Sequence, residues 1–287
     1  MMRTLRIATW FGAVAILAWS CGGPPARTAS EVVAVRAAAL PEDPGDGMWR
    51  QAPAFPAELL LQDMVEPRLL KPTTTFVNVR AVTDGEQIAF RLAWTDDTRD
   101  DMPGAGRFAD ACAIQLPRTI AADVPAPQMG EAGRGVEITF WRATWQGAVD
   151  GRPDEIKAIY PGATVDHYPF EAASLETGSK EQEEMSARYA PARALGNLME
   201  GPRDRPVEDL LAEGPGTLTR SPDQRSTGRG RRSDDGWEVV IRRPLPAGLG
   251  ADGRGQVAFA VWQGASGEVG ARKMRTGWVP IAIEAGS

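Results

Sequence analysis

Few side chains in this chain of 287 residues can bind a transition metal strongly. It has one histidine, His167, and two cysteines, Cys21 and Cys112. Paired-histidine sites, histidine-rich zinc sites and mixed Cys/His clusters all need more of these residues. The sequence also has no Cys-x-x-Cys-His motif, glycine-rich phosphate loop, Gly-x-Ser-x-Gly elbow or iron–sulfur cysteine spacing. Most common enzyme classes are therefore excluded.

Methionine and lysine are the remaining soft or nitrogenous ligands, and one residue of each type is unusual. Met129 lies in a loop between Pro127 and Gly130, which restrict the backbone and would aim its thioether. Lys273 lies between two arginines in a chain with only four lysines. A buried lysine can lose its proton and bind a metal through its neutral amine, whereas arginine cannot. Considered alone, Met129 is more typical of a packing residue and Lys273 of a solvated charge.

Two other groups of residues suggest different ligands. The acidic loop at residues 96–101 offers the carboxylate oxygens that calcium prefers, but without the alternation of a dedicated calcium loop, so a solvated turn is favoured. Several tryptophans could stack on a sugar, yet strand alternation places most of them in the core. These tryptophans are Trp94, Trp141, Trp145, Trp237 and Trp262.

Alternating apolar and polar residues predict a mainly β fold, an antiparallel β-sandwich. The clearest signal is a hairpin of residues 75–82 and 87–95, joined by the turn Asp84-Gly85. Further strands are predicted at residues 111–116, 136–145, 237–243, 256–263 and 278–284. Short strands separated by turn residues are the pattern of a sandwich.

The first 21 residues predict an export signal. Arg3 and Arg6 precede an apolar run at residues 7–19, which is shorter than the roughly 20 residues that span a bilayer. Cys21 follows in a context that resembles a bacterial lipoprotein signal, so we expect either lipidation of Cys21 or plain cleavage a few residues later. Both outcomes predict a periplasmic or other extracytoplasmic protein, whose only membrane contact would be a lipid anchor.

Residues 22–39 are small and polar with prolines, and they predict a flexible tether that leads to a folded domain at residues 40–287. The apolar fraction of 43% is ample for a core. Whether Cys21 is lipidated or removed, only Cys112 would remain as a thiol in the mature chain, so no intrachain disulfide is expected. The net charge of −6, with arginines scattered among acidic residues, provides no basic face for nucleic acid.

Residues 151–235 differ in composition from the rest of the chain. They are rich in proline, glycine and charge, and hold too few apolar residues for a core of their own. We therefore predict a long insertion that lies against the sandwich, with short helices at residues 180–189 and 207–212. The polar and basic stretch at residues 220–232 is predicted to be mobile.

Short segments occur in a characteristic order along the chain. They are DMVEP (63–67), AWTDD (93–97), FADACAIQLP (108–117), MGE (129–131), ALGN (194–197) and GARKMRTGW (270–278). In order and spacing they resemble the haem-binding γ-subunit family of ethylbenzene dehydrogenase, dimethyl sulfide dehydrogenase, and the selenate and chlorate reductases. The resemblance spans residues 40–285.

This resemblance implies a β-sandwich that holds one haem b between a methionine and a lysine, which correspond to Met129 and Lys273. Because the two ligands fill both axial positions, the family's role is electron transfer and not catalysis. The implied partners are a molybdenum catalytic subunit, an iron–sulfur subunit, and a periplasmic cytochrome or similar carrier. Phe140 and Val261 are candidates for the apolar shell that would keep the lysine neutral.

Two other functions stay open. One is an extracytoplasmic β-sandwich module that binds carbohydrate or calcium through surface tryptophans or the acidic loop. The other is a lipoprotein scaffold with no ligand of its own. The long insertion and Cys21 are departures from the family's shorter, soluble members, and they point to a tethered subunit or a free-standing haem protein.

Overall fold

The computed structural model describes residues 30–62, 66–119, 123–153, 156–163, 179–189, 203–246, 249 and 253–284. Several features predicted from the sequence lie outside these residues. They are the export signal with Cys21, the histidine His167, most of the first family segment and the segment at 194–197. The export signal and the lipidation of Cys21 therefore stay predictions.

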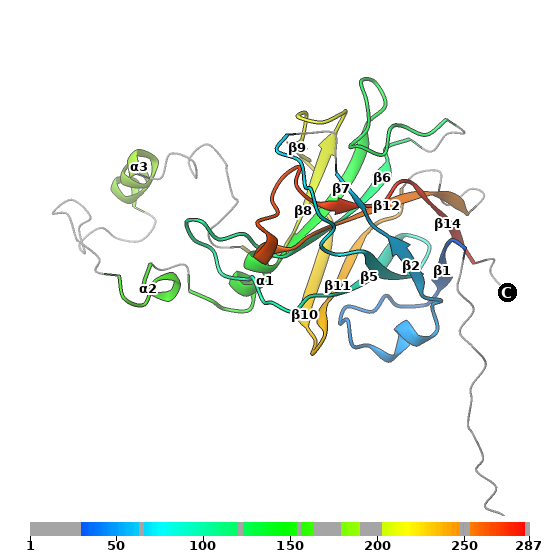
Figure 1. Ribbon diagram of the computed structural model, residues 1–287, viewed down its shortest axis with the longest axis horizontal. Helices are drawn as coiled ribbons and strands as arrows, with labels where there is room; N and C mark the ends of the chain where they lie inside the picture. The colour runs from blue at the N-terminus through cyan, green and yellow to red at the C-terminus, as the bar shows by residue number, and fades with distance from the viewer. Residues whose placement is uncertain are drawn as a thin grey trace, which may run out of the picture.

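The described residues form a mainly β structure, as predicted (Figure 1). The strands are β1 (Val32–Arg36), β2 (Phe55–Glu58), β3 (Leu60–Leu61), β4 (Phe76–Thr83), β5 (Gln87–Thr95), β6 (Ala111–Pro117), β7 (Val136–Arg142), β8 (Val207–Ala212), β9 (Thr219–Arg220), β10 (Thr227–Arg232), β11 (Gly236–Pro244), β12 (Arg254–Trp262), β13 (Met274–Arg275) and β14 (Val279–Ile283). Their order is β10-β11-β5-β4-β1-β14-β12-β6-β7-β8-β9, with β2 on β4, and with β13 and β3 beside β12.

The helical segments are short. They are η1 (Gly47–Arg50), α1 (Ala143–Val149), α2 (Ile156–Ile159), α3 (Lys180–Tyr189) and η2 (Gly264–Ser266). The helix predicted at residues 180–189 is confirmed as α3, whereas the strand predicted at 136–145 ends at Arg142 and its last residues begin α1. Across the described ranges, no helix is both long enough and apolar enough to cross a membrane.

The long strand β12 divides the sheet into two layers. Its residues 254–257 pair with β14 and complete the first layer, which contains β10, β11, β5, β4 and β1. Its residues 258–262 pair with β6 and belong to the second layer, which contains β7, β8 and β9. In the second layer, β13 pairs with the other edge of β12, and β3 pairs with β13.

The two layers pack face to face around one hydrophobic core. Phe90 of β5 contacts Phe259 of β12 across the interface, with ring centroids 6.2 Å apart. Trp141 of β7 lies between Trp94 of β5 and Trp237 of β11, at 6.4 and 5.2 Å. These contacts give the fold its sandwich character. The sheet is nevertheless continuous through β12 and mixed, because β1 is parallel to both β4 and β14.

Strand β1 shows that the ordered structure begins before residue 40. Val32 and Ala34 are buried in the core between β4 and β14. The prediction of a tether up to residue 39 is wrong for this part, because the valines of this segment suit a buried central strand.

The helix predicted at residues 207–212 is wrong, since these residues form β8, antiparallel to β7. Its alternate side chains face opposite sides of the layer: Val207 is in the core and Leu210 packs on the outer surface. Pairing with β7 thus decides the conformation of a segment whose apolar residues are too few to define a period. Residues 203–235 contribute strands to both layers, so this part of the predicted insertion is integral to the sandwich.

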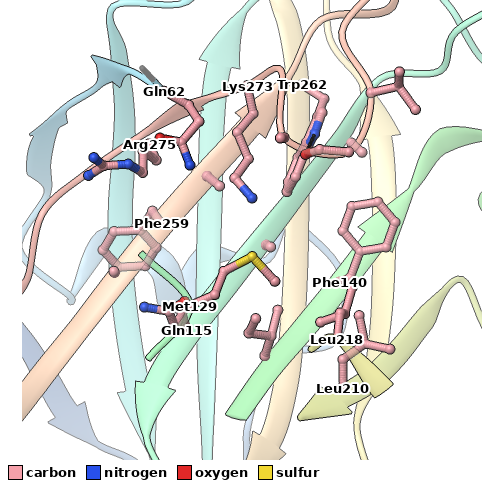
Figure 2. A pocket seen from close by; sticks show the side chains of 18 of the residues that line it. Gln62, Gln115, Met129, Phe140, Leu210, Leu218, Phe259, Trp262, Lys273 and Arg275 are labelled. Atoms are coloured by element: carbon pink, nitrogen blue, oxygen red, sulfur yellow. Dashed lines mark hydrogen bonds between the residues drawn. The ribbon is translucent and has the colours of Figure 1, made fainter. Parts of the chain in front are cut away.

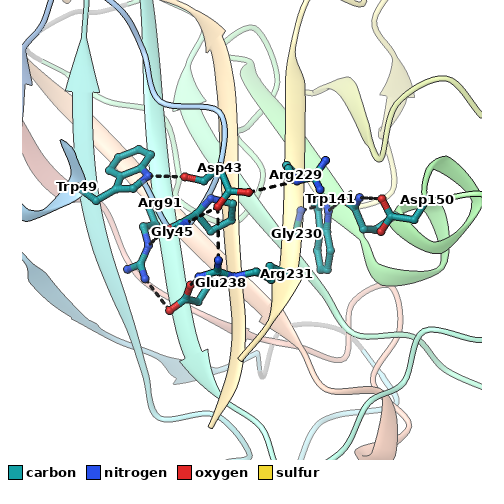
Figure 3. Close-up of polar contacts among 12 residues, drawn as sticks. Asp43, Gly45, Trp49, Arg91, Trp141, Asp150, Arg229, Gly230, Arg231 and Glu238 are labelled. Atoms are coloured by element: carbon teal, nitrogen blue, oxygen red, sulfur yellow. Dashed lines mark hydrogen bonds and ion pairs between the residues drawn. The ribbon is translucent and has the colours of Figure 1, made fainter. Parts of the chain in front are cut away.

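The basic stretch predicted to be mobile contains β10, which is held by charge pairing (Figure 3). Asp43, in the loop before η1, lies 3.5 Å from Arg229 and 3.5 Å from Arg231. Glu238 on the neighbouring strand β11 pairs with Arg231 at 2.8 Å and with Arg91 at 2.7 Å. Because the arginines of β10 meet carboxylates on β11 and on the loop, the strand is ordered despite its polarity.

Candidate functional site

A cavity of about 680 Å³ lies on the outer face of the second layer, opposite the hydrophobic core. Its floor consists of alternate residues of β6, β7, β8 and β12. These floor residues are Ala111, Ala113, Gln115, Ile138, Phe140, Leu210, Ala258, Ala260 and Trp262. The residues between them in β6 and β7, such as Cys112 and Trp141, face the core. This alternation follows from the period of two in a strand.

Small side chains leave room for the cavity. Ala113 is directly opposite Ala260 across the β6–β12 pair, and Ala258 and Ala111 lie beside them on the same face. Four alanines together leave a hollow where larger residues would fill the surface. The volume lies within the range of about 300–1,000 Å³ that is typical of ligand and cofactor pockets.

Met129 reaches the cavity from the loop between β6 and β7. The loop is fixed by hydrogen bonds: Gly130 N donates to Ala126 O at 2.9 Å, Gly214 N donates to Met129 O at 2.8 Å, and Gln115 Nε2 donates to Pro127 O at 3.0 Å. Met129 has a φ of 69°, in the left-handed region that only glycine adopts readily. Such a backbone costs about 1 kcal/mol and often marks a functional position.

Lys273 reaches the cavity from the opposite wall, just before β13. It is only 9% exposed, and its Nζ lies 4.9 Å from the centroid of the Trp262 ring. Burial lowers the pKa of Lys273 to about 8, and the positive charge of nearby Arg275 acts in the same direction. In the described part of the chain no carboxylate is within ion-pair distance of this amine. Burial thus brings the neutral amine closer to neutral pH than in an exposed lysine, although the protonated form still predominates at pH 7.

Figure 2 shows that the sulfur of Met129 and the amine of Lys273 point toward each other across the cavity. The sequence segments that carry them are 144 residues apart, from position 129 to position 273. The fold thus brings the two candidate ligands predicted from the resemblance to opposite walls of one apolar cavity.

Comparison with known proteins gives a family match over most of the chain. A family model described as ethylbenzene dehydrogenase matches residues 46–274. This chain belongs to that family.

Several known proteins are similar to this chain in sequence. A protein of Haloferax mediterranei named as a respiratory nitrate reductase haem subunit (ORF7) is 30% identical over 155 residues, covering 53% of this chain and 52% of that protein. The dimethylsulfide dehydrogenase subunit gamma of Rhodovulum sulfidophilum is 28% identical, covering 79% and 69%. The chlorate reductase subunit gamma of Ideonella dechloratans is 24% identical, covering 78% and 72%. The chain thus spans about half the length of the Haloferax protein and more of the other two.

Among solved structures, a family 9 carbohydrate-binding module of Caldicellulosiruptor kristjanssonii, in complex with cellotriose, overlays with a TM-score of 0.42. The sequence identity is 8%, and the overlay covers 89% of this chain and 94% of that one.

An aromatic wall lines one side of the cavity in this member of the ethylbenzene dehydrogenase family. The ring of Phe140 lies edge-on to Trp145 and to Trp262, with centroids 5.3 and 5.1 Å apart. Phe140 therefore belongs to the apolar shell, as predicted. Val261 does not belong to this shell. It lies between Ala260 and Trp262 in β12, so its side chain points away from the cavity and is fully buried in the core.

The side chains suggested for other ligands have structural roles. The five tryptophans considered for sugar stacking are at most 8% exposed, which confirms the burial predicted for most of them from strand alternation and excludes the alternative of an exposed platform. Asp96 of the acidic loop is buried and accepts hydrogen bonds from Thr98 N at 2.9 Å and Thr98 Oγ1 at 3.0 Å, as in a turn. No cluster of three or more histidine, cysteine or acidic side chains suited to a metal ion occurs in the described ranges.

The donors that face the cavity fit a haem iron. A thioether and an amine with a lowered pKa approach from opposite walls, and both can serve as axial ligands. The floor and the aromatic wall are apolar, which suits a porphyrin ring. The sequence analysis did not identify the alanines of the cavity floor. Their positions at alternate residues of two predicted strands, β6 and β12, could have indicated a face with small side chains. Gln62, Arg275 and Trp262 were also missed as cavity residues.

Proposed function

We propose that this protein binds one haem b between Met129 and Lys273 and acts as an electron-transfer subunit, not as a catalyst. The observation that carries this proposal is the approach of the two side chains from opposite walls of one cavity. Membership of the ethylbenzene dehydrogenase family and the haem subunit among the relatives support it.

When bound, the haem would supply a centre that takes up and releases a single electron. The chain's own residues would set its properties. A thioether ligand raises the potential of a haem relative to a second nitrogen ligand. The burial that lowers the pKa of Lys273 favours the uncharged amine, which is the form that binds iron. If Met129 and Lys273 both bound the iron, no coordination site would stay open for a substrate, and this favours electron transfer.

The proposed partners are a molybdenum catalytic subunit and an iron–sulfur subunit, with a periplasmic cytochrome or similar carrier as the external electron donor or acceptor. The names of two relatives as γ subunits of a dehydrogenase and a chlorate reductase support a place in such a complex. We propose a periplasmic location, with a lipid anchor at Cys21 as its only attachment to a membrane.

The test is a set of four variants of the purified protein. Wild-type protein should show a reducible b-type spectrum. Met129→Ala and Lys273→Ala should each replace the spectrum of the six-coordinate iron by that of a five-coordinate or water-ligated iron. Met102→Ala and Lys71→Ala are matched controls outside the cavity, and they should keep the wild-type spectrum.

Two results would contradict the proposal. One is wild-type protein that stays colourless after refolding with excess haem. The other is an unchanged spectrum in both cavity variants, which would show that other residues bind the iron.

A further inference from the structure

The side chains that line the cavity are unevenly distributed around the two proposed ligands. Figure 2 shows Gln62 and Arg275 on one side of the pair, and Phe140, Leu210 and Leu218 on the other. One end of the cavity therefore carries a positive charge and an amide, whereas these three side chains at the other end are apolar.

The register of β13 explains how Arg275 reaches the cavity. Arg275 pairs with Ala260, a floor residue, and so faces the outer side of the layer. Its neighbour Met274 pairs with Val261 and is buried in the core. Lys273 and Arg275, two residues apart, thus project to the same side of the layer, and the side chain of Gln62 lies between the amine and the guanidinium (Figure 2).

Two polar groups at this end are well positioned. The guanidinium of Arg275 carries five N–H donors, and its Nη1 donates to Thr276 O at 3.3 Å. Gln62 is 3% exposed, and its backbone N donates to Lys273 O at 3.2 Å, which ties it to the ligand segment. Its side-chain amide points into the cavity (Figure 2).

Haem b is itself polar at one edge, where it carries two propionate carboxylates, and apolar at the opposite edge with its vinyl and methyl groups. We propose that Arg275, with Gln62 beside it, binds a haem propionate and so fixes which way round the haem lies in the cavity. This inference rests on the proposed function. Arginine suits the role because its planar fork binds a carboxylate through two parallel hydrogen bonds.

The opposite end of the cavity offers Arg142, but it also holds a protein carboxylate. Glu208 lines the cavity there and lies 2.9 Å from Arg220 and 3.9 Å from Arg203. Because Glu208 is paired with these two arginines, the choice between the ends depends on the apolar side chains. A propionate beside Phe140 would displace the apolar edge of the haem from the aromatic wall, and this favours the Arg275 end for the propionate.

The experiment compares haem b with its dimethyl ester, in which both propionates are uncharged. The full-length protein is loaded with either form, and release is followed as transfer to excess apomyoglobin. In the wild type the ester should leave about tenfold faster or more, as expected for the loss of a charge-assisted hydrogen bond. In Arg275→Gln the two forms should leave at similar rates, because haem b itself is released faster. Arg254→Gln, which removes a charge at the far end of β12, should behave as the wild type does.

Two results would overturn the assignment of Arg275 to the propionate. One is an Arg275→Gln variant that keeps the wild-type difference between the release rates of haem b and its ester. The other is an Arg142→Gln variant that abolishes this difference instead. If Arg275→Gln does not fold, Arg275→Lys replaces it: faster release of haem b with an unchanged ester rate supports the proposal, and equal changes of both rates overturn it. A wild-type protein that binds neither form would refute the proposed function itself. Binding without discrimination in the wild type would refute only the propionate site.

Discussion

The two faces of the second layer are built by the same strands and have opposite properties. On the inner face, Cys112, Ile114 and Trp141 fill the space against the first layer. On the outer face, Ala111 and Ala113 leave a hollow between the same strands. The difference shows that β6 and β7 encode a packed core and a binding cavity in alternate residues. Substitutions at neighbouring positions should therefore separate stability from cofactor binding.

The largest effect is expected from Trp141→Ala on the inner face. Trp141 is fully buried between Trp94 and Trp237, so its removal leaves a large void. We expect the free energy of unfolding to fall by about 3–5 kcal/mol, measured by urea denaturation of the haem-free protein. Phe140→Ala, one position away on the cavity wall, should cost clearly less. Equal losses in the two variants would contradict the separation of the faces.

A pH-dependent effect is expected from Asp110, the inward-facing carboxyl before β6. Its Oδ2 accepts hydrogen bonds from Trp237 Nε1 at 2.8 Å and Asp100 N at 2.8 Å, and its Oδ1 accepts from Gly264 N at 2.9 Å. Burial nevertheless raises the pKa of Asp110 to about 7 from 3.8. The folded protein then holds a proton that the unfolded chain has released, so stability should fall as pH rises between these values, by at most roughly 4 kcal/mol.

Asp110→Asn tests this expectation, because the amide does not titrate. Its absolute stability should be lower than that of the wild type, since an amide nitrogen would face the N–H donors now bound by Oδ2. Its free energy of unfolding should however change less between pH 5 and pH 8 than that of the wild type. These two pH values lie on either side of the raised pKa of Asp110. A variant with the same pH dependence as the wild type would show that another group is responsible.

The smallest effect on stability is expected from Ala113→Phe on the outer face, although its effect on function should be complete. The new ring would occupy the cavity without displacing core residues, so the unfolding free energy of the haem-free protein should change by less than about 1 kcal/mol. Haem uptake, followed by absorbance, should be lost. Cys112→Phe is the matched substitution on the inner face, and overpacking there should cost about 1–3 kcal/mol. Normal haem uptake by Ala113→Phe would contradict the location of the site.

The strand pattern was largely predictable from the sequence, because burial of one face enforces a period of two. The hairpin of β4 and β5, together with β6, β11, β12 and β14, follows that rule. Strand β8 could not be predicted in this way, since its apolar residues are too few to define a period and only pairing with β7 selects the extended form. Strand β10 was missed for another reason: its order depends on carboxylates from a loop and from β11, which are distant in sequence.

The candidate site was predictable only in part. Nothing in the types of Met129 and Lys273 distinguished them from a packing residue and a solvated charge, and the family resemblance singled them out. Their role as iron ligands stays a prediction. The location of the cavity on the outer face could not be foreseen, because it depends on the register that sets Ala113 opposite Ala260. The same register excludes Val261, which sequence alone could not orient.

The course of β12 through both layers also bears on how the protein could take up the proposed haem. One half of this strand is part of the first layer and the other half is part of the cavity floor. The floor therefore cannot open as a separate unit without melting the strand that joins the layers, and it should exchange its amide hydrogens as slowly as the core does. Entry of a haem must then depend on movement of the rim, at the loops around Met129 and before Lys273, within a scaffold that stays folded.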